Sequence, residues 1–274
     1  MKIALMDSGI GLLAAAAAVR RLRPDVDLVL SSAPETMPWG PRTPEDVTER
    51  ALAVAEAAAA QGPDALIIAC NTASVHALPA VRARLEPGIP VIGTVPAIKP
   101  AAAGGGPVAI WATPATTGSP YQRTLIRDFG GGAQVTEVPC PGLADAVQWA
   151  DEEGIDRAIA AAAALTPRDV RAVVLGCTHY ELVAERIRAA VQQPDAYPSP
   201  SSQQRSSRGD PIVLHSSAGA VAAQALRRIG ESLQTEPDTR GRLTVLLGGR
   251  EDTLPKEALA YAEGRDLQAL SHAG

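Results

Sequence analysis

The sequence has few aromatic residues, few cysteines and no long apolar run. Aromatic side chains make up 3% of its 274 residues, so alanine, valine, leucine and isoleucine must build the core. No apolar run approaches the roughly 20 residues that a membrane-spanning helix needs. The net charge of −5 gives no broad attraction for nucleic acid or anionic lipid. We therefore expect a globular protein with no nucleic-acid or membrane partner.

Three cysteines are an odd number, and their positions resemble no disulfide framework. The opening residues, MKIALMDSGIG, place an acid and glycines directly after a short apolar stretch, which is not the pattern of a signal peptide. Both features indicate a reduced cytoplasmic compartment.

Short apolar segments alternate with alanine-rich helical stretches along the chain. Continuous apolar strands separated by helices are typical of a parallel sheet covered on both faces, so we predict an α/β fold with mostly parallel sheets. Strands are expected at 2–6, 27–32, 64–70, 89–95, 107–116, 133–141, 172–179 and 242–249, with a strand–helix unit at 212–228. Helices are expected at 11–24, 44–60, 73–85, 118–129, 142–164, 181–192 and 254–262, and a flexible connection at 101–106.

The two halves of the chain follow the same plan. Asp7 precedes Cys70 by 63 positions, and Thr113, at the corresponding place in the second half, precedes Cys177 by 64. This spacing predicts an internal repeat of two similar α/β units. Ligands of open α/β sheets bind outside the carboxyl ends of the strands, so the strand-end loops of both units should line one cleft.

We expect two pseudo-symmetric domains with the active site between them. The first comprises residues 1–97 plus 212–274, and the second comprises residues 98–211. Within the second, residues 194–210 are rich in proline, serine, glutamine and arginine without periodicity, and we interpret them as a mobile insertion.

Two cysteines occupy the same kind of position, at the end of an apolar strand and just before a helix. LIIACNT carries Cys70, and VVLGCTH carries Cys177. Free backbone N–H groups and the helix dipole at such a position favour a thiolate and also a bound carboxylate. Asn71, Thr72 and Thr178 add side-chain donors directly behind the thiols. If the thiols face each other, one can remove the α-proton of an amino acid while the other protonates the opposite face.

Each of these thiols has a potential helper. His179, two positions after Cys177, can accept or supply a proton near neutral pH. Asp7 follows the first strand and could do the same beside Cys70, or it could merely cap the next helix.

The sequence gives little support for a metal site or a nucleotide-binding site. CTH lacks the ligand spacing of a zinc site, so we predict no metal. DSGIG lacks the third glycine of the dinucleotide fingerprint, so we expect no nucleotide cofactor. Cys140, in VPCP, is interpreted as a small buried residue, and His76 as a packing or surface residue.

Taken together, these residues resemble the glutamate racemases of the aspartate/glutamate racemase superfamily. The matching segments are MDSGIG, MPWGPRTPE, IIACNTAS, IPVIGTV, ATPATTGSPYQ and VVLGCTHYELV, which follow the family's order across most of residues 1–190. The pair CNTAS and GCTHY is specific, because relatives that act on aspartate or hydantoins tend to differ just after these cysteines.

The resemblance implies racemisation of glutamate without a cofactor, supplying D-glutamate for peptidoglycan in a bacterial cytoplasm. It implies that Cys70 takes the proton from D-glutamate and Cys177 takes it from L-glutamate, assisted by Asp7 and His179. It further implies that the substrate is bound by polar side chains and by one loop: Ser8, Asn71, Thr72, Thr113, Thr116, Thr178, and the loop residues Pro38, Trp39 and Gly40.

Several positions depart from the family's pattern. Leu12 stands where a second glycine is usual after DSGxG, and Gln148 aligns with a commonly acidic position after the CP turn. His215 stands near a usual acid, and the 194–210 insertion is longer than is usual. Trp39 replaces a usual tyrosine in the substrate loop. Its larger ring either alters the pocket and its specificity or is a neutral substitution at the rim.

Two alternatives to glutamate racemisation stay open. The same chemistry could act on another small acidic amino acid such as aspartate. The chain could also keep the fold with weakened catalysis and a binding or regulatory role. The sequence leaves the oligomeric state open, with a homodimer as one candidate.

Overall fold

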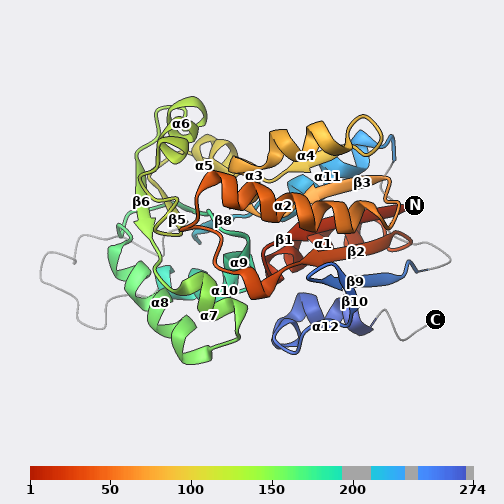
Figure 1. The fold of residues 1–274 in the computed structure, drawn as a ribbon. Helices are drawn as coiled ribbons and strands as arrows, with labels where there is room; N and C mark the ends of the chain where they lie inside the picture. The colour runs from red at the N-terminus through yellow and green to blue at the C-terminus, as the bar shows by residue number, and fades with distance from the viewer. Residues whose placement is uncertain (193–210, 232–239, 270–274) are drawn as a thin grey trace, which may run out of the picture.

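The structure, a computed structural model, describes residues 1–192, 211–231 and 240–269. The predicted mobile insertion at 194–210 lies outside these residues. Two sheets organise the described chain (Figure 1). The first contains β1 (Lys2–Asp7), β2 (Asp27–Ser32), β3 (Ala65–Ile68), β4 (Val91–Gly93), β9 (Leu243–Leu247) and β10 (Arg250–Asp252). The second contains β5 (Val108–Ala112), β6 (Val135–Pro139), β7 (Ala172–Leu175) and β8 (Val213–His215).

The two sheets share one strand order. The first runs β10-β9-β2-β1-β3-β4, and the second runs β6-β5-β7-β8, so β5 to β8 occupy the places of β1 to β4. All strand pairs between the described strands are parallel except β9 with β10. The predicted α/β class with mostly parallel sheets is confirmed, and the repeat inferred from the spacing appears as a repeated topology.

One strand belongs to a different sheet from the one expected. Residues 212–274 were assigned to the first unit, but β8 pairs with β7 of the second sheet, with Val173 opposite Leu214. The following helix α11 (Ala218–Arg228) then packs against α1 (Leu13–Leu22) of the first unit. The chain therefore crosses between the sheets after His215, because β8 completes the second sheet at an edge that no other described strand occupies.

The other helical elements connect these strands. They are η1 (Ile10–Leu12), η2 (Pro34–Thr36), α2 (Pro44–Ala59), α3 (Asn71–His76), α4 (Leu78–Leu85), α5 (Ile98–Ala103), α6 (Pro120–Phe129), α7 (Leu143–Gln148), α8 (Glu152–Leu165), α9 (Thr178–Glu181), α10 (Ala184–Gln192), η4 (Ala258–Ala260) and α12 (Ala262–Ala269). Helix α2 begins as its sequence predicts, because the Thr43 side chain accepts a hydrogen bond from the Asp46 amide and Pro44 opens the first turn.

Two predicted long helices are each divided in the structure. The helix expected at 73–85 separates at Ala77 into α3 and α4, with Pro79 in the first turn of α4, where the missing proline N–H costs little. The helix expected at 142–164 is interrupted at Ala150, which has a φ of 51°. Asp151 then starts α8 by accepting a hydrogen bond from the Gly154 amide.

Two further segments were assigned wrongly from the sequence. The flexible connection expected at 101–106 begins in the last turn of α5, where Ala101 is fully buried against the second sheet. The helix expected at 254–262 is a 3₁₀ turn, η4, and the regular helix α12 starts only at Ala262.

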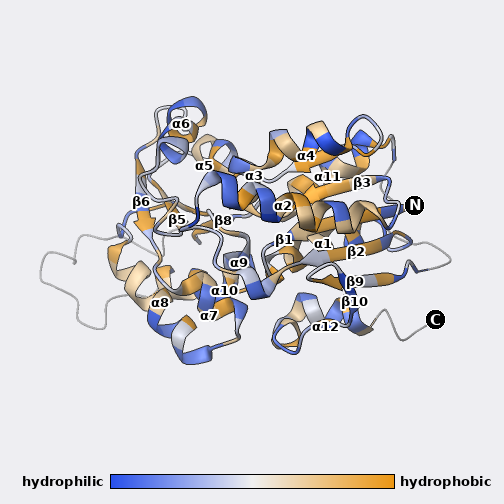
Figure 2. Ribbon diagram, in the orientation of Figure 1, coloured by the Kyte–Doolittle hydropathy of each residue, from blue (hydrophilic) through white to orange (hydrophobic). Residues whose placement is uncertain are grey.

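The core shows why so few aromatic residues suffice. Alanines 14–18 of α1 are all buried, and α1 packs against the helices α11 and α12. Small side chains allow these helices to approach closely. Strand β3 is hydrophobic along its length (Figure 2). One buried cluster includes Leu5 of β1 and Trp111 of β5, so a continuous apolar core joins the two sheets.

Candidate active site

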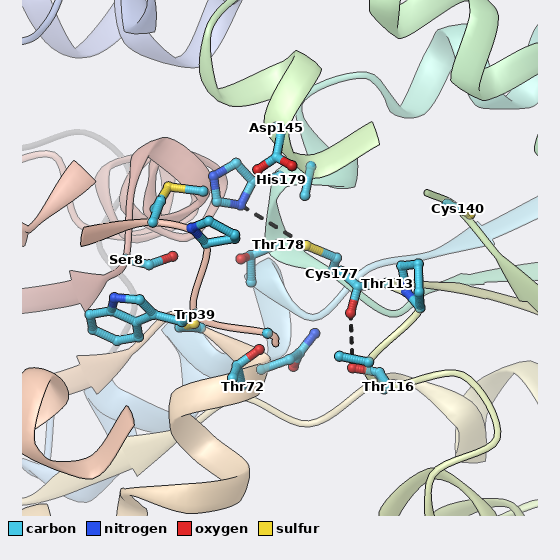
Figure 3. Close-up of a pocket in the computed structure, with 18 of the residues that line it drawn as sticks. Ser8, Trp39, Thr72, Thr113, Thr116, Cys140, Asp145, Cys177, Thr178 and His179 are labelled. Atoms are coloured by element: carbon cyan, nitrogen blue, oxygen red, sulfur yellow. Dashed lines mark hydrogen bonds between the residues drawn. The ribbon is translucent and has the colours of Figure 1, made fainter. Parts of the chain in front are cut away.

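A single cavity of about 260 Å³ brings together the strand ends of both sheets (Figure 3). Its walls come from the residues after β1, β3, β5 and β7, as the repeat predicts. All the site residues expected from the sequence line this cavity: Asp7, Ser8, Pro38, Trp39, Gly40, Cys70, Asn71, Thr72, Thr113, Thr116, Cys177, Thr178 and His179. The geometry therefore brings these residues together at one cavity.

The two cysteines have nearly the same backbone geometry. Cys70 precedes α3 with φ −138° and ψ 120°, and Cys177 precedes α9 with φ −138° and ψ 137°. In each case an extended residue ends the strand connection, and the next polar residue starts a helix. The duplicated local sequence thus places two thiols in equivalent positions on opposite sheets, at one cavity.

Burial opposes the ionisation of both thiols. It raises the pKa of Cys70 well above its usual range and the pKa of Cys177 to about 12. Backbone N–H groups at the helix starts lower these pKa values, as the sequence predicted, but their effect is smaller than that of desolvation. Each thiol therefore needs a nearby group to take its proton.

Asp7 is the last residue of β1 and is fully buried beside Cys70. Its Oδ1 accepts hydrogen bonds from the amide and hydroxyl of Ser8, at 2.6 and 3.3 Å. Burial raises the pKa of Asp7 to about 7, while neighbouring donors, first among them the Cys70 thiol, lower it. Asp7 does not cap the next helix, because Gly9 holds the N-cap position of η1.

His179 lies in α9 beside Cys177 and is almost completely buried. Its Nδ1 is 4.0 Å from Cys177 Sγ, as the dashed line in Figure 3 marks. Its Nε2 is 3.0 Å from Oε1 of Gln148. Burial lowers the pKa of His179 to about 4, so the imidazole is neutral at pH 7. Each cysteine thus has its own ionisable neighbour.

Asn71 and two threonines supply uncharged polar groups. Asn71 Nδ2 donates a 2.8 Å hydrogen bond to the Gly176 carbonyl, whereas its Oδ1 has no partner among the described residues. Oδ2 of Asp7 likewise makes no hydrogen bond of normal geometry there. The hydroxyls of Thr113 and Thr116 lie 3.2 Å apart on another wall. Unpaired buried acceptors are costly, so they suit a bound donor.

Trp39 belongs to the core more than to the rim. It is 2% exposed and packs with Met6 and Val47 in a buried cluster. Its Nε1 donates a 2.8 Å hydrogen bond to Thr36 Oγ1. In Figure 3 its indole lies on the far side of the cavity from Thr113. The interpretation of Trp39 as a rim substitution is therefore wrong.

Some lining residues were not expected from the sequence. They are Met37, Pro41, Pro114, Ala115, Cys140, Pro141, Gly142, Ala144, Asp145 and Gly176. Cys140 is nonetheless buried, as expected, and its thiol donates to the Val138 carbonyl at 3.5 Å. Its position just after β6, at another strand end, was the signal that could have placed it here. His76 is exposed and does not line the cavity.

The potential metal ligands of the cavity are not clustered. Across the described residues, no cluster of three or more His, Cys, Asp and Glu side chains could hold a metal ion. None of the described lining residues is lysine or arginine. Bound carboxylates would therefore meet hydroxyl, amide and backbone N–H donors.

Among the described residues, no helix is long and apolar enough to cross a membrane.

Comparisons with known proteins agree with the site. The Asp/Glu/Hydantoin racemase family model matches residues 11–198. The chain is 36% identical over 192 residues to a glutamate racemase of Roseiflexus sp. (strain RS-1), covering 68% of this chain and 70% of that protein. It is 31% identical over 246 residues to a glutamate racemase of Ectopseudomonas mendocina (strain ymp), covering 86% and 85%.

Solved structures show the same fold. Escherichia coli glutamate racemase, in complex with L-glutamate and the activator UDP-MurNAc-Ala, aligns with a TM-score of 0.73 at 24% identity, covering 98% of this chain and 94% of that one. Thermus thermophilus glutamate racemase, in complex with β-chloro-D-alanine, aligns with a TM-score of 0.64 at 25% identity, covering 98% and 93%. With its repeated α/β topology and its paired cysteines at one cavity, the chain belongs to the Asp/Glu/hydantoin racemase family, whose members are isomerases.

Proposed function

We propose that this protein interconverts L- and D-glutamate without a cofactor, with Cys70 and Cys177 as the two bases. One observation carries the proposal: two equivalent strand-end thiols, each with its own ionisable neighbour, line one small cavity. The names of the relatives support glutamate as the substrate. Inversion at a carbon needs a proton acceptor on one face and a proton donor on the other, which a pair of thiols supplies.

The proposed reaction removes the α-proton from one face of the substrate and adds a proton to the opposite face. Starting from D-glutamate, the Asp7 carboxylate takes the Cys70 proton, and the Cys70 thiolate removes the α-proton. The Cys177 thiol then donates its proton to the opposite face of the carbanion, leaving a Cys177 thiolate. Exchange with solvent removes the proton from Asp7 and returns one to Cys177, which restores the resting state. From L-glutamate the roles are reversed, and His179 takes the proton of Cys177. Because both thiols are protonated at rest, each direction depends on its assisting group.

The unpaired acceptors suit the substrate's ammonium group. Oδ1 of Asn71 and Oδ2 of Asp7 are buried and make no hydrogen bond of normal geometry to the described residues, so an ammonium would satisfy both. We assign the carboxylates to neutral donors: Ser8, Thr72, Thr113, Thr116, Thr178 and the backbone of the loop Pro38, Trp39 and Gly40. Donors aimed at the α-carboxylate stabilise the negative charge that develops when the α-proton leaves.

The wider biological role follows from the same proposal. The protein would act in a bacterial cytoplasm and supply D-glutamate for the synthesis of peptidoglycan. The proposed domains are 1–97 with the chain after β8, and 98–215, which revises the earlier boundary by the sheet to which β8 belongs. Homodimer formation stays a prediction, which sedimentation velocity of the purified protein can check.

The decisive experiment incubates the pure protein with each glutamate enantiomer in heavy water. We expect deuterium to enter the α-position and both enantiomers to approach equal amounts. Cys70→Ala and Cys177→Ala should each abolish racemisation. Cys140→Ala is the matched control and should remain active, because its thiol is bound to the Val138 carbonyl. Full activity in either of the first two variants would refute the two-base assignment. Faster turnover of aspartate than of glutamate would instead overturn the substrate.

A further inference from the structure

Gln148 links three segments that are far apart in the sequence. It ends α7 and is 2% exposed. Its side-chain oxygen, Oε1, accepts a 2.9 Å hydrogen bond from the backbone amide of Ile10, 138 residues away. The same oxygen lies 3.0 Å from Nε2 of His179. Gln148 therefore connects the loop after β1 to the histidine beside Cys177.

The Ile10 amide determines which atom of Gln148 faces the histidine. A backbone N–H can only donate, so the side-chain atom beside it must be the acceptor oxygen and not the NH₂ group. A glutamine carbonyl oxygen can only accept, so Nε2 of His179 must carry a hydrogen. A neutral imidazole has one N–H, and its Nδ1 is then a lone pair. The Nδ1 atom that carries this lone pair lies 4.0 Å from Cys177 Sγ.

We infer that Gln148 is a positioning residue that holds neutral His179 in its Nε2–H tautomer, so that Nδ1 accepts the proton of Cys177. The catalytic role of Nδ1 as a proton acceptor rests on the proposed function, because only a two-base reaction requires the Cys177 thiol to ionise. The tautomer itself follows from hydrogen bonds that exist without substrate. The sequence indicated only that Gln148 stands at a commonly acidic position.

The surroundings of His179 explain why an amide differs from a carboxylate at position 148. The titratable groups near the imidazole are Cys177 at the start of α9, Asp7 at the end of β1 and Asp145 on α7, which Figure 3 shows beside it. Asp7 Oδ2 and His179 Nδ1 converge on Gly11, where an added Cβ would lie 2.5 and 2.7 Å from them. A further negative charge at Nε2 would favour the imidazolium, which has no lone pair to accept a proton. The uncharged amide avoids this outcome.

The test measures the imidazole directly. The protein contains four histidines, so ¹⁵N-histidine labelling gives few signals, and His179→Gln identifies the signal of interest by its loss. In the wild-type protein we expect a pyrrole-type Nε2 and a pyridine-type Nδ1 that persist from pH 5 to pH 8. A protonated Nδ1 in the neutral ring, or an imidazolium at pH 7, would overturn the inference.

Two variants separate positioning from general support of the fold. Gln148→Glu keeps an acceptor for both Ile10 and Nε2 but adds a charge, so the pKa of His179 should rise by about 1–3 units. Gln148→Leu removes the acceptor, so the ring should show mixed tautomers, and kcat/KM should fall about tenfold in both directions. At pH 8 the glutamate variant should keep most of the activity that the leucine variant loses.

The outcomes distinguish this inference from the proposed function. If the wild-type protein does not racemise glutamate but shows the expected tautomer and titration, the function fails while the role of Gln148 stands. If it racemises glutamate and neither variant changes the ¹⁵N signals of His179, the function stands and the inference fails.

Discussion

Asn71 donates a 2.8 Å hydrogen bond from its Nδ2 to the carbonyl oxygen of Gly176. The residue after one cysteine is thereby tied to the residue before the other, across 105 positions of sequence. This bond fixes the distance between the two strand ends. We expect Asn71→Ala to destabilise the protein by about 1–2 kcal/mol, since it leaves a buried carbonyl unpaired.

Asn71→Ala should also lower kcat/KM equally in both directions, because the equilibrium constant of a racemisation is one. Thermal unfolding and circular-dichroism assays of both enantiomers provide the measurements. Asn71→Asp keeps an acceptor at Oδ1 but cannot donate to Gly176, so it should behave like the alanine variant. A variant as stable and as active as the wild type would show that the bond does not hold the site.

Asp7 should make the stability of the protein depend on pH. Its pKa is about 7 in the folded protein, compared with the ordinary value of 3.8. The folded state thus keeps this proton while the unfolded state loses it, and the contribution of Asp7 to stability falls as pH rises from about 4 to about 7. Asparagine does not titrate and avoids this loss.

We therefore expect Asp7→Asn to be more stable than the wild type at pH 8, by at most about 4 kcal/mol, and similar to it at pH 4. Urea unfolding of both proteins at pH 4, 6 and 8 measures the difference. The variant should at the same time lose racemisation, because Cys70 loses its proton acceptor. A stability difference that does not change with pH would contradict the assignment of this pKa.

Gly11 should tolerate no side chain. A Cβ there would lie 2.5 Å from Asp7 Oδ2, 2.6 Å from Thr178 Oγ1 and 2.7 Å from His179 Nδ1. Gly11→Ala should therefore destabilise the protein by about 1–3 kcal/mol and displace both assisting groups. Gly219 in α11 is the matched control, since an added Cβ would meet nothing within 4 Å.

Gly219→Ala should raise stability by up to about 1 kcal/mol through helix propensity and leave activity unchanged. Denaturant titrations and initial rates of the two variants make the comparison. Wild-type activity in Gly11→Ala would mean that Asp7 and His179 can be displaced without loss of catalysis.

Tyr261 ties the C-terminal part of the described chain to α7. Its hydroxyl donates a 2.6 Å hydrogen bond to the carbonyl of Val147, the neighbour of Gln148. Tyr261→Phe should cost about 0.5–1.5 kcal/mol and loosen α7 against the first sheet. Tyr121→Phe is the control, because the Tyr121 hydroxyl makes no hydrogen bond to the described residues, and it should change stability little.

Hydrogen exchange of the α7 amides can measure this loosening. Faster exchange in Tyr261→Phe, with unchanged exchange in Tyr121→Phe, is the expected result. Equal exchange in both variants would show that packing alone holds α7.

Local pattern was enough to predict much of the fold. The apolar runs that become β1, β2 and β3 are short and bounded by polar residues, so their positions were readable. The division of the two long helices could not be predicted. The breaks at Ala77 and Ala150 depend on backbone conformations that an alanine in the sequence does not indicate. The sheet to which β8 belongs could not be predicted either, since the sequence of a three-residue strand does not indicate which strand it pairs with.

The sequence by itself determined that Cys70 and Cys177 end equivalent strands, because strand period, helix start and repeat spacing are all local properties. Only the tertiary structure decided that both thiols line one cavity, that Asp7 has a pKa of about 7, and that Gln148 contacts His179. The physical reason is that desolvation and hydrogen-bond partners depend on which distant segments enclose a group. For Gln148 that partner, Ile10, lies 138 residues away.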